Sequence, residues 1–94
     1  MRCLTKDEIQ KKLELLDGWV LEDSGQALLK TYTFADFVEA FGFMVRVALV
    51  AEKMDHHPDW TNVYNRVSVR LNTHDAGGVT LKDFALLEKM EVFA

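Results

Sequence analysis

Apolar residues recur at helical spacing near the start of the chain, directly after a polar capping-box pattern. They are Ile9, Leu13 and Leu16. In such a box the Thr5 side chain accepts from the backbone N–H of Glu8, and the Glu8 side chain reaches back to the N–H of Thr5. We therefore expect a short amphipathic helix that begins after Thr5 and ends at about Asp17, because Gly18 is a common helix terminator.

Two short apolar segments then flank a polar turn. They span residues 19–22 and 27–34, and the intervening Asp23-Ser24-Gly25 is typical of a tight turn. The alternation in the second segment is imperfect because Leu28 and Leu29 are adjacent, so the pattern leaves its inner face open. Together the two segments predict a β-hairpin.

The longest apolar segment runs from Phe34 to about Asp55 without a proline, and it predicts a long helix. Its apolar residues cover more than one stripe: Phe37, Val38, Phe41, Phe43, Met44, Val45, Val47, Ala48, Leu49 and Val50. A helix on a sheet needs only one apolar face, so we expect the second face to contact a partner subunit. A membrane span is the alternative, but the run is shorter than about 20 residues and contains Arg46.

The pattern changes at Pro58, which cannot continue a helix and disfavours helical geometry at His57. We therefore expect the long helix to end between Asp55 and His57. From Val63 to Asn72 apolar and polar residues alternate, which predicts the clearest strand of the chain. The pattern Thr80-Leu-Lys-Asp83 then predicts a capped final helix. Its expected inward stripe is Phe84, Leu87 and Met90.

The predicted order is helix, two strands, long helix, a strand or strand pair, and helix. This order predicts an α+β fold, with an antiparallel sheet of about four strands and three helices packed on one face. The 94 residues suit one hydrophobic core, so we interpret residues 1–94 as a single domain.

Composition narrows the function classes. The net charge of −4, with both signs interspersed, does not favour a nucleic-acid interface. The one cysteine, Cys3, has no internal partner for a disulfide, and we do not expect it to be catalytic. The N-terminus becomes charged at once and does not resemble a signal sequence. These features favour a reducing, cytoplasmic location, with the nucleus as a second option.

All three histidines lie between Glu52 and Asp83. Imidazole has an unperturbed pKa of about 6.5, so it can donate or accept a proton near neutral pH. The cluster therefore indicates acid/base chemistry, although each histidine alone also fits a polar surface role. A metal site is a weaker alternative, because adjacent His56 and His57 project in different directions and helical zinc sites space their histidines about four residues apart.

The joint spacing is more specific than any single histidine. It consists of Glu52, His56-His57-Pro58, Tyr64, His74 and Asp83. It resembles the signature of the pterin-4a-carbinolamine dehydratase family, and the flanking residues agree. These are Ala40–Met44, Arg46–Leu49, Ala51–Pro58, Asp59-Trp60 and Asn62–Asn65. The resemblance covers essentially the whole chain from the first predicted helix to the last.

The resemblance implies an enzyme that dehydrates 4a-hydroxytetrahydropterin (4a-hydroxytetrahydrobiopterin) to quinonoid dihydropterin plus water. The substrate is the carbinolamine that pterin-dependent aromatic amino acid hydroxylases release, so the reaction belongs to tetrahydrobiopterin recycling. Such enzymes use no metal and no organic cofactor. Expelling the hydroxyl group needs an acid and removing the N5 proton needs a base, which imidazoles can supply.

By the same resemblance, His56 and His74 carry the acid/base work, and His57 holds the pterin and its developing charge. Which of His56 and His74 is the acid stays open. The expected substrate-binding residues are Glu52, Asp55, Trp60, Thr73, Asp75 and Asp83.

Three of these residues also have a structural interpretation. Glu52 is expected to orient His56, since residues four apart share a helix face; the alternative is a solvated helix residue. Asp83 suits the first turn of a helix slightly better than a substrate contact. Trp60 fits a wall of the site and ordinary core packing equally well.

The resemblance also implies partners. Members of the family form a homotetramer whose long helices make a four-helix bundle, so we expect a homo-oligomer, a dimer or a tetramer, built through the long helix. They also act as dimerization cofactors of a hepatocyte homeodomain transcription factor, binding its dimerization helix through the long-helix surface. A non-enzymatic coactivator is therefore the alternative function.

Overall fold

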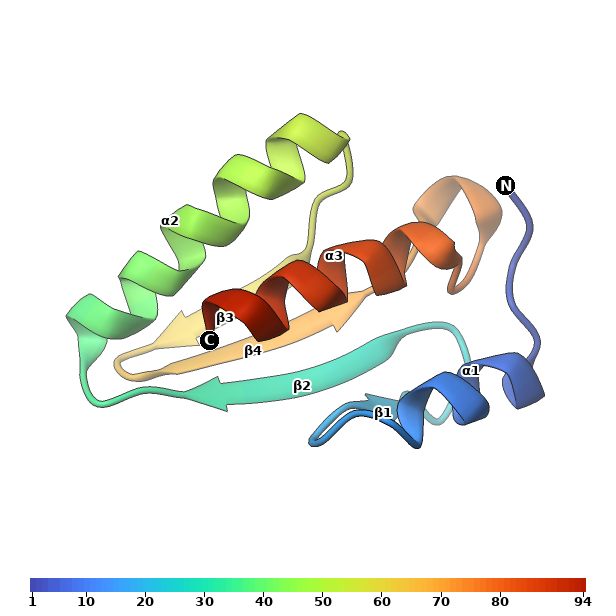
Figure 1. Cartoon of the computed structure of the whole chain (residues 1–94), viewed down its shortest axis with the longest axis horizontal. Helices are drawn as coiled ribbons and strands as arrows, with labels where there is room; N and C mark the ends of the chain where they lie inside the picture. The colour runs from blue at the N-terminus through green and yellow to red at the C-terminus, as the bar shows by residue number, and fades with distance from the viewer.

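The computed structural model describes the whole chain, Met1–Ala94. In chain order its elements are α1 (Lys6–Leu13), β1 (Val20–Leu21), β2 (Leu28–Thr33), α2 (Phe37–Met54), β3 (Asp59–Val63), β4 (Arg66–Leu71), the 3-10 turn η1 (His74–Ala76) and α3 (Leu81–Phe93) (Figure 1). None of the helices is both long enough and apolar enough to cross a bilayer.

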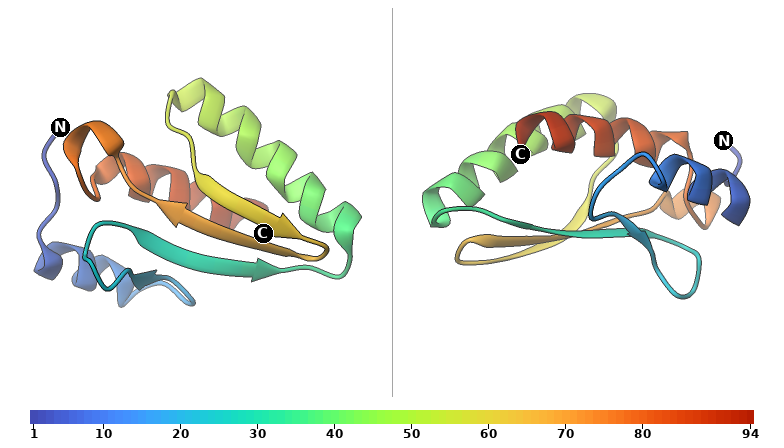
Figure 2. Two further views of the ribbon diagram at one scale, coloured as in Figure 1. Left: turned by 180° about the vertical axis from the view of Figure 1, so that it is seen from behind. Right: turned by 60° about the horizontal axis from the view of Figure 1, so that its bottom comes forward.

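The strands form one antiparallel sheet in the order β1-β2-β4-β3. β2 and β4 pair along their whole length, with Tyr32 opposite Val67. The right-hand view of Figure 2 shows α1, α2 and α3 on the same side of this sheet. The predicted fold class, an α+β fold with four antiparallel strands and three helices on one face, is confirmed.

A core of 17 buried residues lies between the sheet and the helices. Alternation along β4 supplies part of it, because Val67, Val69 and Leu71 are buried while Ser68 is exposed. The predicted inward stripe of the last helix is also buried, and Leu86 joins it. This packing fixes α3 against the sheet and thereby places the N-terminal end of α3, where the candidate site lies.

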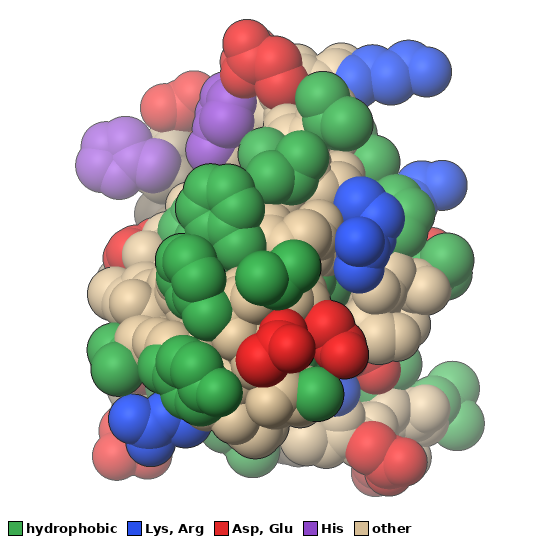
Figure 3. All heavy atoms as spheres, turned by 90° about the vertical axis from the view of Figure 1, so that its left-hand side faces the viewer, with side chains coloured by type: hydrophobic (Ala, Val, Ile, Leu, Met, Phe, Trp, Pro, Cys, Tyr) green, Lys and Arg blue, Asp and Glu red, His purple; other side chains and the backbone are tan.

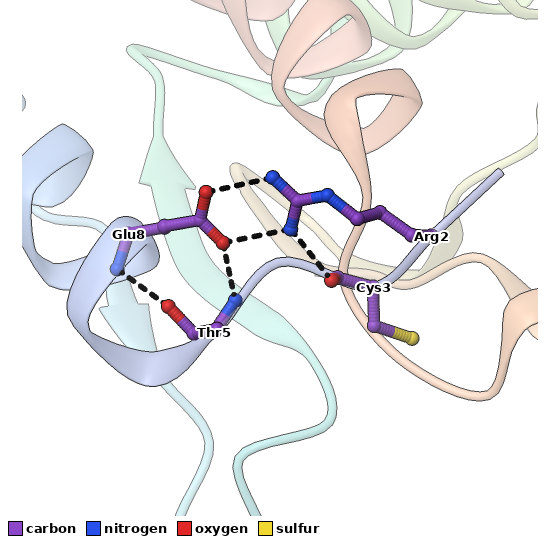
Figure 4. Close-up of polar contacts among 4 residues, drawn as sticks. All are labelled: Arg2, Cys3, Thr5 and Glu8. Carbon is purple, nitrogen blue, oxygen red and sulfur yellow. Dashed lines mark hydrogen bonds and ion pairs between the residues drawn. The ribbon is translucent and has the colours of Figure 1, made fainter.

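The predicted capping box at the start of α1 is confirmed. The hydroxyl of Thr5 accepts from the Glu8 backbone N–H, and Glu8 accepts from the Thr5 N–H. Arg2 adds two hydrogen bonds of 2.8 Å to the same carboxylate (Figure 4). These bonds from Arg2, followed by the Thr5 N–H, lower the pKa of Glu8 to about 2.

The extent of two predicted helices is wrong. α1 ends at Leu13 rather than near Asp17, because the backbone tightens there and the Leu16 N–H bonds to the Leu13 carbonyl. The long helix begins at Phe37 rather than Phe34. Asp36 sets that start by accepting from the Glu39 N–H at 2.9 Å.

The predicted alternative of a strand pair between the long helix and the last helix is confirmed, but the strand predicted from Val63 to Asn72 begins only at Arg66, after a turn that joins it to β3. Tyr64 adopts a left-handed conformation with φ 49°, and with Asn65 it reverses the chain. An apolar residue at position 65 would continue the alternation of the predicted strand, but the residue there is the polar Asn65. This break in the pattern marks the turn. The hairpin predicted earlier in the chain is confirmed, with Val20 opposite Leu29.

Candidate active site

A backbone reversal at the C-terminus of α2 directs the two adjacent histidines to different sides. Asp55 ends the helix in a left-handed conformation (φ 53°, ψ 44°), and the N–H of His56 bonds to the Ala51 carbonyl at 3.0 Å. The predicted helix end between Asp55 and His57 is confirmed. The reversal turns one imidazole inward and the other outward: His56 is buried, whereas His57 is exposed.

His56 is held by a buried carboxylate from α3. Its Nε2 lies 2.6 Å from Oδ1 of Asp83, whose side chain has no exposed surface. Asp83 stands in the first turn of α3, where the helix dipole stabilises a negative charge. It also completes the capping box with Thr80. Asp83 therefore has the predicted structural role in the first turn of α3, and it also contacts a histidine directly.

His57 has a different carboxylate partner. Its Nε2 lies 2.8 Å from Oε1 of Glu52, and both side chains are more than half exposed. The expectation that Glu52 orients His56 is wrong, because the left-handed residue Asp55 takes His56 off the helix face. An exposed pair of this kind contributes little free energy, so Glu52 holds His57 only loosely.

His74 enters from the connection between β4 and α3. It begins the short turn η1, which Gly77 closes with φ 75°. The backbone N–H of Thr73 donates to the Gly78 carbonyl at 2.8 Å, so the ends of this loop are tied together. His74 is exposed and its ring forms no hydrogen bond within the chain.

The N-terminal arm holds the same loop from outside. The thiol of Cys3 donates to the carbonyl of Ala76, with a distance of 3.0 Å, and the N–H of Leu4 donates to the carbonyl of Val79 at 2.8 Å. Cys3 is exposed and unpaired in the chain. Its observed role is therefore to contact the backbone of the turn that carries His74.

The three histidines line one pocket of about 300 Å³, as the sequence led us to expect. The whole lining is polar and consists of Asp55, His56, His57, Asn72, Thr73, His74, Asp75 and Lys82. The volume is at the lower end of the range of about 300–1,000 Å³ for small-molecule sites. The geometry brings these groups together, and their catalytic roles stay a prediction.

The remaining predicted residues lie outside this lining. Glu52 contacts the pocket-lining residue His57, and Asp83 contacts the pocket-lining residues His56 and Thr73. Trp60 lies in β3 and packs against the core, so it is not a wall of the pocket. Sequence reasoning missed Asn72 and Lys82, although each directly precedes a predicted residue, which was the available signal.

Two other kinds of site suit the chain less well. No three His, Cys, Asp or Glu side chains lie close enough together to hold a metal ion. A larger hollow of about 430 Å³ lies over the sheet and includes Arg70. It contains no histidine, and the Arg70 guanidinium already bonds to Glu22, which lowers the pKa of Glu22 to about 2. The polar pocket therefore remains the better candidate for acid/base chemistry.

Comparisons with a family model and with known proteins indicate the same family. The family model described as pterin 4 alpha carbinolamine dehydratase matches residues 2–93. A relative from Rhizobium johnstonii is 55% identical over 91 residues, covering 97% of this chain and 90% of the relative. One from Afipia carboxidovorans is 56% identical over 95 residues, covering 100% and 95%. Both carry the name "Putative pterin-4-alpha-carbinolamine dehydratase".

A solved structure is also similar. The crystal structure of a protein described as a transcriptional coactivator/pterin dehydratase from Brucella melitensis superposes with a TM-score of 0.96. The two sequences are 47% identical, and the match covers 99% of each chain.

Proposed function

This chain belongs to the pterin 4 alpha carbinolamine dehydratase family, and from that premise we propose that it dehydrates 4a-hydroxytetrahydropterin by histidine acid/base catalysis. In this hydro-lyase reaction the C4a–O bond breaks and the oxygen takes a proton and leaves as water. N5 loses its proton, a C4a=N5 double bond forms, and the product is quinonoid dihydropterin. The reaction would serve tetrahydrobiopterin recycling.

The convergence of three histidines on one pocket is the observation that carries this proposal. His56 follows α2 and His74 lies in η1, so the two imidazoles reach the pocket from different elements. We assign the proton transfers to this pair and the holding of the pterin to His57. The reaction moves protons and changes no oxidation state, so imidazoles alone can supply its chemistry.

The polar lining also suits a pterin. A pterin ring presents N–H groups and acceptor atoms along its edges, and hydrogen-bonding groups in a pocket fix the orientation of a ligand. Asp55, Thr73 and Asp75 border the pocket with side-chain or backbone groups of both kinds. We propose that Asp55 and Asp75 orient the substrate between the histidines, whereas Thr73 acts on it through the contact between Asp83 and His56.

Single substitutions of the two proton carriers test this function. His56→Ala and His74→Ala should each slow carbinolamine dehydration at least about tenfold, since positioned general acids and bases contribute at least about a hundredfold. Lys53→Ala, an exposed change on α2 outside the pocket, is the control. Circular dichroism should show the same fold in all variants. Parent-like turnover in both histidine variants would remove the assignment.

We further propose that the enzyme is a homo-oligomer, a dimer or tetramer, built through α2. The face of α2 away from the core carries an exposed apolar row, here called the α2 stripe: Val38, Phe41, Val45 and Leu49. Figure 3 shows hydrophobic side chains gathered on this side of the molecule. Spacings of three and four residues place the row on one helix face, as helix bundles require.

A coactivator role is the second candidate. The Brucella melitensis protein is described with both activities, and the α2 stripe could bind the amphipathic dimerization helix of a homeodomain transcription factor. Such a role would need the nucleus in addition to the cytoplasmic location proposed for dehydration. A protein with this role alone would tolerate loss of its histidines, so the histidine variants distinguish the two functions.

A further inference from the structure

Two threonines surround the carboxylate that holds His56, Thr73 through its hydroxyl and Thr80 through its backbone N–H. Oδ2 of Asp83 accepts one hydrogen bond from the Thr80 backbone N–H and one from the Thr73 hydroxyl, both at 2.9 Å. The hydroxyl oxygens of Thr73 and Thr80 are 2.6 Å apart. Thr80 and Asp83 have no exposed surface, whereas Thr73 borders the pocket. The cluster therefore lies directly behind the proposed proton carrier.

The number of protons fixes the direction of these bonds. Each hydroxyl carries one proton, and Thr73 gives its proton to Asp83, so the bond between the threonines uses the proton of Thr80. The Thr80 oxygen accepts in turn from the Lys82 N–H at 3.2 Å. An ionised carboxylate has no proton to donate, so Nε2 of His56 donates to Oδ1. Both Thr73 and His56 thus donate to Asp83.

This direction determines which nitrogen of His56 is free. With Nε2 protonated, Nδ1 carries the lone pair of the neutral ring. Nδ1 forms no hydrogen bond within the chain, and no buried side-chain polar atom lacks a partner, so Nδ1 is accessible. Since His56 lines the pocket, Nδ1 is the atom that can exchange a proton there.

We propose that Thr73 and Thr80 are positioning residues that tune the proton affinity of His56 through Asp83. They stabilise the charge on Asp83 and fix its orientation, and so limit how strongly it attracts the Nε2 proton. The inference rests on the proposed dehydratase function. The hydroxyls of both threonines are occupied within the cluster, so they act on the substrate only through Asp83 and His56.

Removing the Thr73 donor has a predictable sign. Less of the charge on Asp83 is then neutralised by hydrogen bonds, so Asp83 stabilises the imidazolium of His56 more strongly. The ring should protonate at higher pH whether it acts as acid or as base. The other charged or titratable groups around the pocket stay unchanged in such a variant: Asp55, His57, His74, Asp75 and Lys82.

Thr73→Val is the cleanest test, because valine keeps the shape of the side chain and leaves the Thr80 cap of α3 in place. We expect kcat/KM to fall about tenfold, as is usual when a partner that orients a histidine is lost. The limb of the pH profile that reports His56 should move to higher pH, and NMR titration of the His56 ring should show the same shift. Thr73→Ser should recover most of the loss.

The control is Thr61→Val, the same change at an exposed position of β3 outside the pocket. A Thr73→Val protein with the parent pH profile and parent NMR titration would overturn the inference, even if its activity were lower. A parent chain without dehydratase activity would instead contradict the proposed function. In that case the NMR titration alone would decide whether Thr73 tunes His56.

Discussion

His56 and Asp83 are 27 residues apart in sequence, yet Nε2 of the one lies 2.6 Å from Oδ1 of the other. The contact joins the end of α2 to the first turn of α3. Asp83 could not be buried as a charge without such partners, and His56 could not keep one tautomer without Asp83. One carboxylate thus caps a helix and prepares an imidazole for proton transfer.

Asp83→Asn should reverse the direction of the hydrogen bond between residue 83 and His56. The Thr80 N–H is a fixed donor, so the amide oxygen of the new side chain would face it, and the amide NH₂ would face His56. Nε2 must then accept, and the ring proton moves to Nδ1, on the pocket side. We expect kcat/KM to fall roughly a hundredfold or more, as when an orienting carboxylate is lost from a catalytic histidine.

Steady-state kinetics with circular dichroism would check this prediction. The amide still caps α3, so the helix content should match that of the parent. ¹⁵N NMR of the His56 ring should report the change of tautomer directly. Activity within threefold of the parent would show that the contact between His56 and Asp83 does not control catalysis.

Glu52→Gln should have a much smaller effect. The pair formed by Glu52 and His57 has exposed side-chain fractions of 82% and 58%, so water replaces much of what the carboxylate provides. Exposed pairs contribute about 0–1 kcal/mol, and we therefore expect less than about a fivefold change in kcat/KM. Measured beside Asp83→Asn in the same assay, an equally large loss would contradict this ranking.

The sequence allowed prediction of those features that depend on local chemistry. Thr5 and Thr80 begin helices because their side chains accept hydrogen bonds from backbone N–H groups. Pro58 prevents α2 from continuing, whatever the structure of the residues that follow. Clustering of the histidines was predicted from spacing and resemblance, and the pocket brings them together. Such features need little knowledge of the tertiary structure.

Residue spacing alone does not determine which carboxylate contacts which histidine. The left-handed conformation of Asp55 assigns Glu52 to His57 rather than His56, and no residue type at that position requires it. By sequence Trp60 fitted a wall of the site and the core equally well, and the turn at Tyr64 creates β3, in which Trp60 packs against the core. Both outcomes depend on backbone reversals at residues other than glycine.

Two surface carboxylates should make stability depend on acid pH. The pKa values of Glu8 and Glu22 are lowered from 4.5 to about 2, chiefly by hydrogen bonds from Arg2 and Arg70. Because the folded values are the lower ones, both groups stabilise the fold fully above their unfolded pKa. This contribution should disappear as the pH falls from about 4.5 toward about 2.

Urea unfolding between about pH 6 and about pH 2 would measure this loss. Glu8→Gln and Glu22→Gln should each flatten the acid limb of the stability curve, and the double variant should flatten it further. The side chains of Glu8 and Glu22 are partly exposed, at 39% and 26%, so added salt should weaken the effect. Acid limbs identical to that of the parent would show that the arginine contacts contribute nothing.

A charge on the α2 stripe should break the proposed assembly. The side chains of Val38 and Leu49 are 77% and 70% exposed in the single chain, and burying them against another helix would stabilise an oligomer by removing apolar surface from water. A lysine in place of Leu49 would be desolvated in that interface without a partner, which is costly. Ala85→Lys adds the same side chain at an exposed position of α3 and serves as the control.

Light scattering at micromolar concentration distinguishes the outcomes. The parent and Ala85→Lys proteins should have a mass that is a multiple of the 10.8 kDa chain, whereas Leu49→Lys should approach 10.8 kDa. The variant should keep its helix content, because residue 49 lies outside the core and lysine is a good helix former. A parent that scatters as a single chain would refute the assembly, and the α2 stripe would then be free for a partner helix of a different protein.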